Sequence, residues 1–168
     1  SGKYNRDLWE LILLNVRLPI LVEGDLQCQV GACNVGERAL GELVQHYGCA
    51  QVDAAIEEIL RRSEAQMRQR IETIPDGVYR AERPLELLDK ETGKRPMVRL
   101  QIEIRGQEMV FDFAGTDGQI PVYYNSSYPN TVSSCFIGLF STIAPDIKIN
   151  HGSMRPLRVE APLGSLVN

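Results

Sequence analysis

Apolar residues recur every three to four positions along the first 75 residues of the chain, which is the spacing of an amphipathic helix. A long pattern of this kind covers residues 22–47 and stops at Gly48, and a second one covers residues 50–74. A shorter pattern near residues 8–14 must end or break at Pro19. Because so few residues separate the two long patterns, the sequence predicts an antiparallel helical hairpin.

The period changes to two after Pro75-Asp76-Gly77. Apolar side chains alternate with polar ones over residues 98–105 and again over residues 109–113, on either side of a glycine turn. An earlier strand is predicted from Val78 to Leu88, with a polar turn at Thr92-Gly93-Lys94 before the next strand. Three antiparallel strands therefore follow the helices.

The last third of the chain mixes loop, helix and strand patterns. Residues 114–130 lack a core period and combine small, polar and aromatic side chains, as loops do. A helix is predicted from about 130 to 144, with Asn130 as its N-cap and Pro145 as its stop. Three apolar residues then indicate one or two closing strands: Val159, Leu163 and Leu166.

Together these patterns predict an α+β fold, in which an N-terminal antiparallel helical hairpin packs with an antiparallel β-sheet and a further C-terminal helix. Residues 1–75 are expected to be mainly helical, and residues 76–168 mainly β with one helix around 130–144. At 168 residues and 43% hydrophobic, the chain is long enough for one ordinary core. We therefore expect residues 1–168 to form a single domain or a fragment of one.

The long helix predicted at 22–47 carries a stripe of small residues on one face. Each glycine inside a helix costs about 1 kcal/mol relative to alanine, so another element is expected to approach this stripe closely. The four cysteines show no paired spacing, and we expect reduced, mostly buried thiols at Cys28, Cys33 and Cys135. The stripe consists of Cys28, Ala32, Gly36 and Ala39.

Charge and hydropathy argue against two classes of partner. The net charge is -4 without a basic cluster, whereas nucleic-acid phosphates demand concentrated Lys and Arg. No apolar run approaches the roughly 18 residues that span a bilayer. We therefore expect no nucleic-acid partner and no membrane partner, and the unpaired cysteines favour a cytoplasmic location.

The chain offers few groups for catalysis or metal binding. Neither His46 nor His151 has a second His, Cys or carboxylate at ligand spacing, so no metal site is predicted. No serine stands in a Gly-x-Ser-x-Gly elbow, and the glycine-rich stretches lack the Gly-Lys-Ser/Thr ending of a phosphate loop. The catalytic residues are therefore unknown from the sequence, and no cofactor is assigned to this segment.

Candidate substrate contacts lie in the loop 114–130 and beyond it. The amide of Asn125 and the hydroxyls of Ser126 and Ser127 suit a planar cyclic amide or a carboxylate, and Arg155 could hold an anion through two hydrogen bonds. Loop polarity alone predicts the same composition. Three interpretations stay open for this loop: substrate binding, an ordinary surface, or a subunit interface.

Eight short phrases are spread over nearly the whole chain: Asn15-Val16-Arg17, Gly24-Asp25-Leu26, Gly36-Glu37-Arg38, Pro75-Asp76-Gly77, Phe111-Asp112-Phe113, Asn150 with Gly152, Arg155-Pro156 and Gly164-Ser165. In their order these phrases resemble the hydantoinase B/oxoprolinase family. This family comprises the B subunits of ATP-dependent N-methylhydantoinases and 5-oxoprolinases and their relatives in acetone and acetophenone carboxylases.

The resemblance implies that this chain is an interior piece of a B-type protein several times longer. It implies an ATP-dependent complex that opens a small cyclic amide such as a hydantoin or 5-oxoproline, in which an A-type ATP-binding subunit phosphorylates the amide-derived oxygen and its B-type partner supports attack by water. ATP and a divalent metal are then expected elsewhere in the complex, and a second B-type subunit is a further expected partner.

Two alternatives to the hydrolase remain from the sequence. One is a subunit region of an ATP-dependent acetone or acetophenone carboxylase, which activates a ketone and bicarbonate. The other is a non-catalytic structural module that docks other subunits through the small-residue stripe and the loop. In every case the isolated segment is expected to be inactive.

Overall fold

The computed structural model of the chain describes residues 5–86, 93 and 95–168. These residues form two compact units, Ser1–Ala55 and Ile56–Asn168. The first unit is helical, and the second contains a four-stranded sheet and its covering helices. The α+β class expected from the sequence is confirmed.

Helix α1, Arg6–Leu14, and helix α2, Pro19–Tyr47, make up most of the first unit. The side chain of Asn5 caps α1 by accepting a hydrogen bond from the Leu8 amide at 3.1 Å. Pro19 begins α2 instead of interrupting it, since a proline in the first turn needs no amide hydrogen bond. Gly48 ends α2 with a positive φ of 82°, as the sequence predicts.

None of the residues of α2 is buried, and all of α2 lies within the described residues. The burial that we expected for the apolar face of this helix is therefore not found. A Cβ added to Gly36 would meet nothing within 4 Å, so no described element approaches the small-residue stripe there. Helical spacing sets which residues share a face, but it does not supply the surface that covers that face.

All four cysteines are free, but the expected burial is wrong for most of them. Cys28, Cys33 and Cys49 are exposed, because α2 and the start of the next helix present these positions to solvent. Cys135 is half-buried beside the sheet, and its burial raises the pKa of the thiol.

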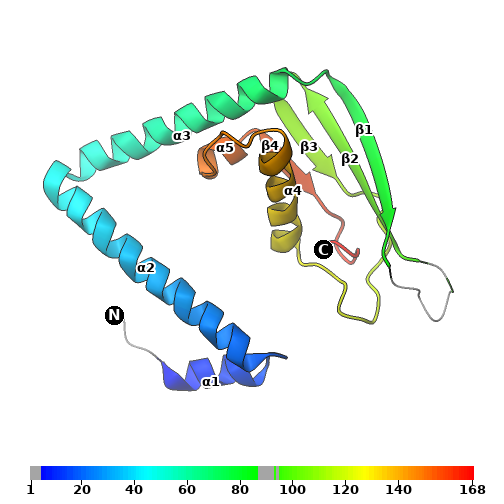
Figure 1. Cartoon of the computed structure of the whole chain (residues 1–168), viewed down its shortest axis with the longest axis horizontal. Helices are drawn as coiled ribbons and strands as arrows, with labels where there is room; N and C mark the ends of the chain where they lie inside the picture. Colours follow the sequence, from blue (N-terminus) through cyan, green and yellow to red (C-terminus); the bar gives the residue numbers. More distant parts are fainter. Residues whose placement is uncertain (1–4, 87–92, 94) are drawn as a thin grey trace. The chain divides into compact units, whose positions relative to one another are not determined.

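The second unit is organised around one sheet with strand order β1-β2-β3-β4, coloured green to red in Figure 1. The strands are β1 (Gly77–Pro84), β2 (Met97–Arg105), β3 (Glu108–Asp112) and β4 (Leu157–Glu160). The first three pair antiparallel as predicted, but β4 pairs parallel to β3. The chain crosses over through two helices before it returns to the sheet, and a parallel pair requires such a crossover.

Some strand predictions ended at the wrong place or lie outside the described residues. Strand β1 ends at Pro84, although the sequence predicts it as far as Leu88, which lies outside the described residues together with Thr92 and Lys94 of the predicted turn. Only one closing strand, β4, forms among the described residues. Leu163, which could have belonged to a second strand, lies in a turn and is 90% exposed.

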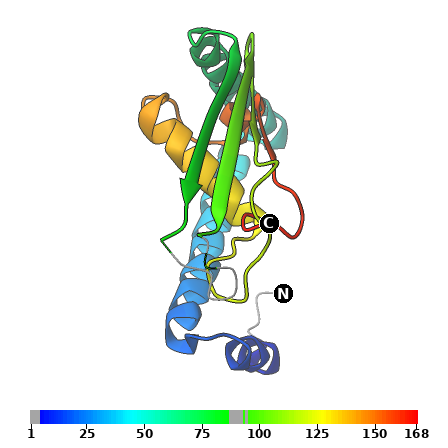
Figure 2. The same ribbon diagram turned by 90° about the vertical axis from the view of Figure 1, so that its right-hand side faces the viewer.

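The hydrophobic core lies between the inner face of this sheet and two helices. Helix α4, Tyr128–Thr142, crosses that face (Figure 2), and the second half of α3, Cys49–Glu72, closes one end of it. Helix α4 begins two residues before the predicted N-cap Asn130, since Ser127 is the N-cap and a proline occupies the first turn. The largest core residues are Met67, Ile71, Ile104, Met109, Phe111, Phe113, Leu139, Phe140, Ile147 and Leu157.

A short helix that the sequence does not predict, α5 (His151–Met154), docks on α3. Asn150 caps α5 in a capping box with Ser153 and donates its side-chain amide to the Ser63 hydroxyl at 2.7 Å. A Cβ added to Gly152 would lie 2.0 Å from the Leu60 carbonyl oxygen. Only glycine permits this close approach between the two helices.

Gly152→Ala is therefore expected to destabilise the chain by about 1–3 kcal/mol, because the methyl group would overlap the backbone of Leu60. The matched control is Gly36→Ala, where the added methyl group meets nothing within 4 Å, and helix propensity predicts a gain of about 0.5–1 kcal/mol. Denaturant unfolding of both variants measures the difference. Equal stability of the Gly152 variant and the parent chain would disprove the close contact.

Candidate functional site

The loop that follows β3 is fastened to β2 at its beginning. The carboxylate of Asp117 accepts a hydrogen bond from the Met97 amide at 2.8 Å and pairs with the Arg99 guanidinium at 3.0 Å. The Thr116 hydroxyl accepts from the Arg99 amide at 3.0 Å and donates to the Arg99 carbonyl at 2.9 Å. The side chains of Thr116 and Asp117 thus bond to backbone groups of β2 at residues 97 and 99, where β3 no longer pairs with it.

The same loop is bound along its length by the C-terminal segment 161–168. Gln119 donates its amide to the Gly164 carbonyl at 2.9 Å, and Leu166 donates to the Asp117 carbonyl at 2.9 Å. Further along, the Ser126 amide donates to the Leu166 carbonyl at 2.8 Å. These backbone hydrogen bonds fix the course of the loop on the surface of the second unit.

Asn125, a predicted substrate contact, closes a tight turn within the loop. Its side-chain oxygen accepts from the Ile120 amide at 3.0 Å. Its side-chain nitrogen donates to the carbonyls of Ile120 at 2.7 Å and Val122 at 3.2 Å. The amide group is therefore used inside the loop and positions it.

The two adjacent serines differ in how far their hydroxyls are occupied. The Ser126 oxygen accepts from Asn130 at 2.9 Å and from Thr131 at 3.2 Å, which ties the loop to the first turn of α4. Ser127 is exposed and is the N-cap of α4, but its side chain makes no capping bond. Within the part of the chain that the structure describes, its hydroxyl has no hydrogen-bond partner.

Two tyrosines stand side by side on the exposed part of this loop. The rings of Tyr123 and Tyr124 are stacked with their centroids 4.7 Å apart, and Tyr123 is 77% exposed. The hydrogen bond with Tyr123 is the main cause that raises the pKa of Tyr124. The loop therefore presents exposed aromatic surface three to four residues before Ser127 in the chain.

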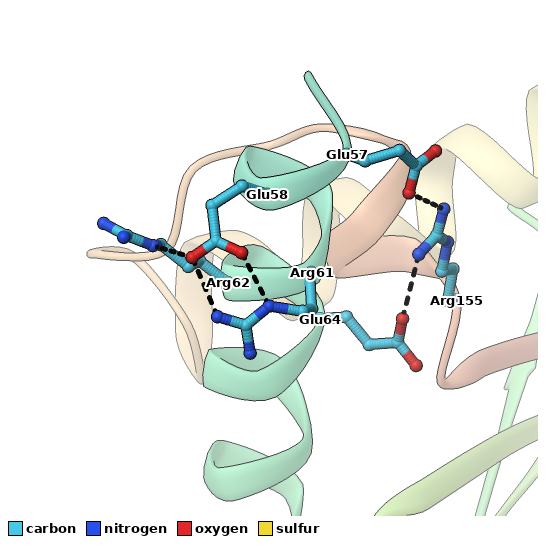
Figure 3. A network of polar contacts seen from close by, with 6 residues as sticks. All are labelled: Glu57, Glu58, Arg61, Arg62, Glu64 and Arg155. Carbon is cyan, nitrogen blue, oxygen red and sulfur yellow. Dashed lines mark hydrogen bonds and ion pairs between the residues drawn. The ribbon is translucent and has the colours of Figure 1, made fainter. Parts of the chain in front are cut away.

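Arg155, the remaining predicted contact, is engaged with α3. Figure 3 shows its guanidinium between two carboxylates, Glu64 at 3.2 Å and Glu57 at 3.7 Å. Arg68 also pairs with Glu64 at 2.9 Å. The hydrogen bond with Arg68, and then the one with Arg155, lowers the pKa of Glu64.

A second cluster of ion pairs lies on the same helix, α3, and joins one carboxylate to two arginines (Figure 3). Glu58 accepts from Arg61 at 2.7 Å and from Arg62 at 2.6 Å, and these two bonds lower its pKa to about 2. Both clusters are composed of ion pairs at a surface, so such pairs add little to stability and mainly fix side-chain direction.

The predicted site residues are not brought together by the fold. Asn125, Ser126 and Ser127 are neighbours in the loop, whereas Arg155 follows α5. Figures 1 and 2 both show α5 and the loop near opposite ends of the sheet. The substrate contacts of these four residues stay predictions. A small ligand that binds the loop serines is not held by Arg155 at the same time.

An apolar cavity of about 460 Å³ lies between α4 and the inner face of the sheet. The sequence did not predict it, although a glycine and small polar residues on one face of α4 are a signal for incomplete packing. Its lining includes Tyr79, Leu100, Ile102, Cys135, Gly138 and Ile143. The cavity offers shape and apolar surface, with few groups that could orient a polar substrate.

Two structural findings bear on cofactors and membranes. Across residues 5–86, 93 and 95–168, no group of three or more His, Cys, Asp or Glu side chains could hold a metal ion. Within the same ranges, no helix is long and apolar enough to cross a membrane.

The family model described as hydantoinase B/oxoprolinase matches residues 1–168. The B component of a putative D-/L-hydantoinase from Pseudomonas sp. (strain NS671) is 33% identical over 180 residues, covering 100% of this chain and 30% of that protein. The beta chain of the caprolactamase from Pseudomonas jessenii is 36% identical over 171 residues, covering 100% of this chain and 29% of that protein.

Solved structures extend these similarities to the fold. The crystal structure of the ATP-dependent caprolactamase from Pseudomonas jessenii matches with a TM-score of 0.81 at 35% identity, covering 100% of this chain and 29% of that one. A nucleotide-free acetone carboxylase matches with a TM-score of 0.75 at 18% identity, covering 99% of this chain and 24% of that one, which shows a shared fold alone. The chain thus spans about 30% of the length of these two curated relatives.

Asn125→Ala should loosen the loop, because three hydrogen bonds that close residues 120–125 are lost. We expect a loss of about 1 kcal/mol in unfolding free energy and faster amide exchange in the loop. Ser127→Ala is the control, since its hydroxyl has no partner among the described residues and its loss should leave both quantities unchanged. Unchanged exchange in the Asn125 variant would contradict the structural role.

The charge cluster around Glu64 predicts an acid dependence. Because its pKa is lowered in the folded state, Glu64 stabilises the fold above its ordinary value of 4.5, and this contribution is lost as pH falls through the lowered pKa. Arg155→Gln removes one cause of the lowering, so the variant should be less stable than the parent chain near neutral pH, and the two stabilities should converge as pH falls and Glu64 becomes protonated in both. Denaturant unfolding between about pH 7 and pH 3 measures this, with Lys148→Gln as a charge-matched control; identical profiles would contradict it.

Proposed function

We propose, on the premise that the chain belongs to the hydantoinase B/oxoprolinase family, that it forms the central region of a B-type subunit in an ATP-dependent complex that opens cyclic amides. The observation that carries this proposal is the likeness to the caprolactamase beta chain, which extends over the whole chain in sequence and in fold. That relative is named a caprolactamase, and a lactam is a cyclic amide. Its crystal structure is described as that of an ATP-dependent enzyme.

The proposed reaction divides between subunits. An amide is a poor electrophile, so an A-type ATP-binding subunit transfers the terminal phosphoryl group of ATP to the amide oxygen and releases ADP. Water then adds to the activated carbon, the ring C–N bond breaks and phosphate leaves. ATP and a divalent metal act outside this segment, whose described residues do not fit a metal-binding group.

This segment's own contribution is a positioned surface for a neutral ring. The loop is held by β2 and by segment 161–168, so its exposed groups are placed before a substrate binds. The free Ser127 hydroxyl can donate to an amide carbonyl or accept from a ring N–H, and neither role requires a titrating group. Asn125 acts as a positioning residue for that hydroxyl.

Two further parts of this proposal concern the assembly. The relatives are named as B and beta components of their enzymes, which supports a multi-subunit complex, and we extend this to an A-type ATP-binding subunit and a second B-type subunit. We also place the complex in the cytoplasm. The carboxylase alternative has no observation in its favour, because the acetone carboxylase match shows the fold alone.

The test uses the full-length B-type protein in complex with its A-type partner, and the 168-residue chain alone. The complex should open hydantoin, 5-oxoproline or caprolactam only with ATP, whereas the isolated chain should turn over neither ATP nor any of these amides. Ser127→Ala in the full complex should lower turnover at least about tenfold, or roughly 1.4 kcal/mol in the barrier.

Ser133→Ala is the matched control, since this serine is also exposed but lies within α4. ATP-dependent carboxylation of acetone without amide opening would replace the hydrolase with the carboxylase. Full activity of the Ser127 variant would remove the loop from the substrate site and leave the family function untouched.

A further inference from the structure

Strand β1 has a free edge in the described part of the chain. It is the first strand in the order β1-β2-β3-β4, so β2 occupies one side of it and no described strand occupies the other. Its eight residues are exposed apart from half-buried Gly77. A free edge of this length presents unpaired backbone donors and acceptors to any strand that fits it.

The register shows which backbone groups face that free edge. The Leu85 amide donates to the Pro96 carbonyl at 2.8 Å, and in an antiparallel pair the bonded positions alternate. Tyr79, Ala81 and Arg83 therefore bond to β2. The backbone N–H and C=O groups of the residues between them, Val78, Arg80 and Glu82, point outward.

An independent bond supports the same alternation. Arg99 lies opposite Glu82 in the register, so its amide should point away from β1. The structure agrees, since that amide donates to the Thr116 hydroxyl at 3.0 Å, on the far side of β2. The free edge is therefore defined at every position from Val78 to Glu82.

The residues along this edge are complementary to themselves. If a second β1 runs antiparallel with Ala81 opposite its own copy, Arg80 lies opposite Glu82 of the second copy, and Glu82 lies opposite its Arg80. Those are the positions whose backbone groups point outward, so each pair can also exchange two main-chain hydrogen bonds. Arg80 has no ion-pair partner among the described residues, whereas Glu82 lies 3.5 Å from the Arg99 guanidinium, at the long end of ion-pair distances, and keeps a second carboxylate oxygen for Arg80 of the other copy.

We propose that a second copy of this chain binds here, with the two β1 strands joined antiparallel about a two-fold axis at Ala81. The two sheets then form one continuous sheet, and every contact occurs twice, as a two-fold dimer requires. This dimer would give a position to the second B-type subunit of the proposed function. The proposal rests on the proposed function only because that function includes a second B-type subunit.

The inner side of the edge fits the same arrangement. Tyr79 is 44% exposed, and its hydroxyl donates to the Pro75 carbonyl at 2.8 Å, which fixes the ring beside the apolar cavity. In the proposed dimer, Arg83 of the second copy lies opposite Tyr79. A guanidinium over a tyrosine ring is a favourable cation–π contact, and it would also cover apolar surface that is now open.

Charges on an edge strand can also serve to keep other strands away. Edge charges prevent the binding of another strand when that strand places a like charge opposite them or leaves them without an opposite charge. Here the alternation Arg80-Ala81-Glu82 gives opposite charges in the antiparallel register, and it would give like charges in a parallel one. The pattern therefore selects one orientation of the second strand.

Sedimentation of the full-length B-type protein over a range of concentrations should show a monomer–dimer equilibrium. Arg80→Glu and Glu82→Arg should each lower the association constant at least about tenfold, which corresponds to roughly 1.4 kcal/mol, because both pairs become repulsive. An equimolar mixture of the two variants should dimerise again, since each restores the charge that the other lost. Lys148→Glu, with the same charge change outside β1, should behave as the parent chain.

Amide exchange gives a second readout that does not depend on any variant. The amides of Val78, Arg80 and Glu82 should gain protection as concentration rises, whereas those of Tyr79 and Ala81 should be protected at every concentration. A monomer at all concentrations, or a dimer that both charge variants leave intact, overturns the proposal. Neither result concerns turnover, so the proposed function is tested separately.

Discussion

The contact between Gly152 and the Leu60 carbonyl is the constraint on which the rest of the second unit depends. It sets how closely α5 approaches α3, and the Asn150 cap and its bond to Ser63 set the direction in which the chain leaves. Strand β4 begins three residues after α5, so the docking of α5 on α3 fixes where the chain starts its return to the sheet, in which β4 pairs parallel to β3.

That dependence links the core to the surface proposed for the substrate. The segment after β4 binds the loop through Gly164 and Leu166, and the loop in turn begins on Asp117, which is held by β2. The Ser127 hydroxyl, which we propose as a substrate contact, thus lies in a loop that is held by β2 at its beginning and by segment 161–168 along its length. Such preorganisation reduces the ordering that a ligand must impose when it binds.

Ion pairs recur in the second unit, but they mainly orient the side chains and helices that they join and add little to the stability of the fold. Arg155 joins α5 to Glu64 and Glu57 on α3, and ion pairs at a surface contribute little to the free energy of unfolding. The same argument applies to Arg80 and Glu82 at the free edge. Opposite charges there choose a register and an orientation, while main-chain bonds and the Tyr79 ring supply the attraction.

The sequence by itself determined the elements whose signal is local. Helix and strand periods follow from backbone geometry, so α2, α3, β2 and β3 were predicted nearly to their ends. The family resemblance needed only the order of short phrases. Gly48 and Gly106 marked their turns because few other residues adopt a positive φ. Only the tertiary structure decided which surfaces meet, because those contacts depend on residues far apart in the chain.

Helix α5, the parallel β4 and the exposure of α2 have no local signature. For the candidate site, the sequence supplied suitable groups in Asn125, Ser127 and Arg155 but no distances between them. The fold then separated Arg155 from the loop and used the Asn125 amide internally, since each buried or half-buried polar group must first satisfy its own hydrogen bonds.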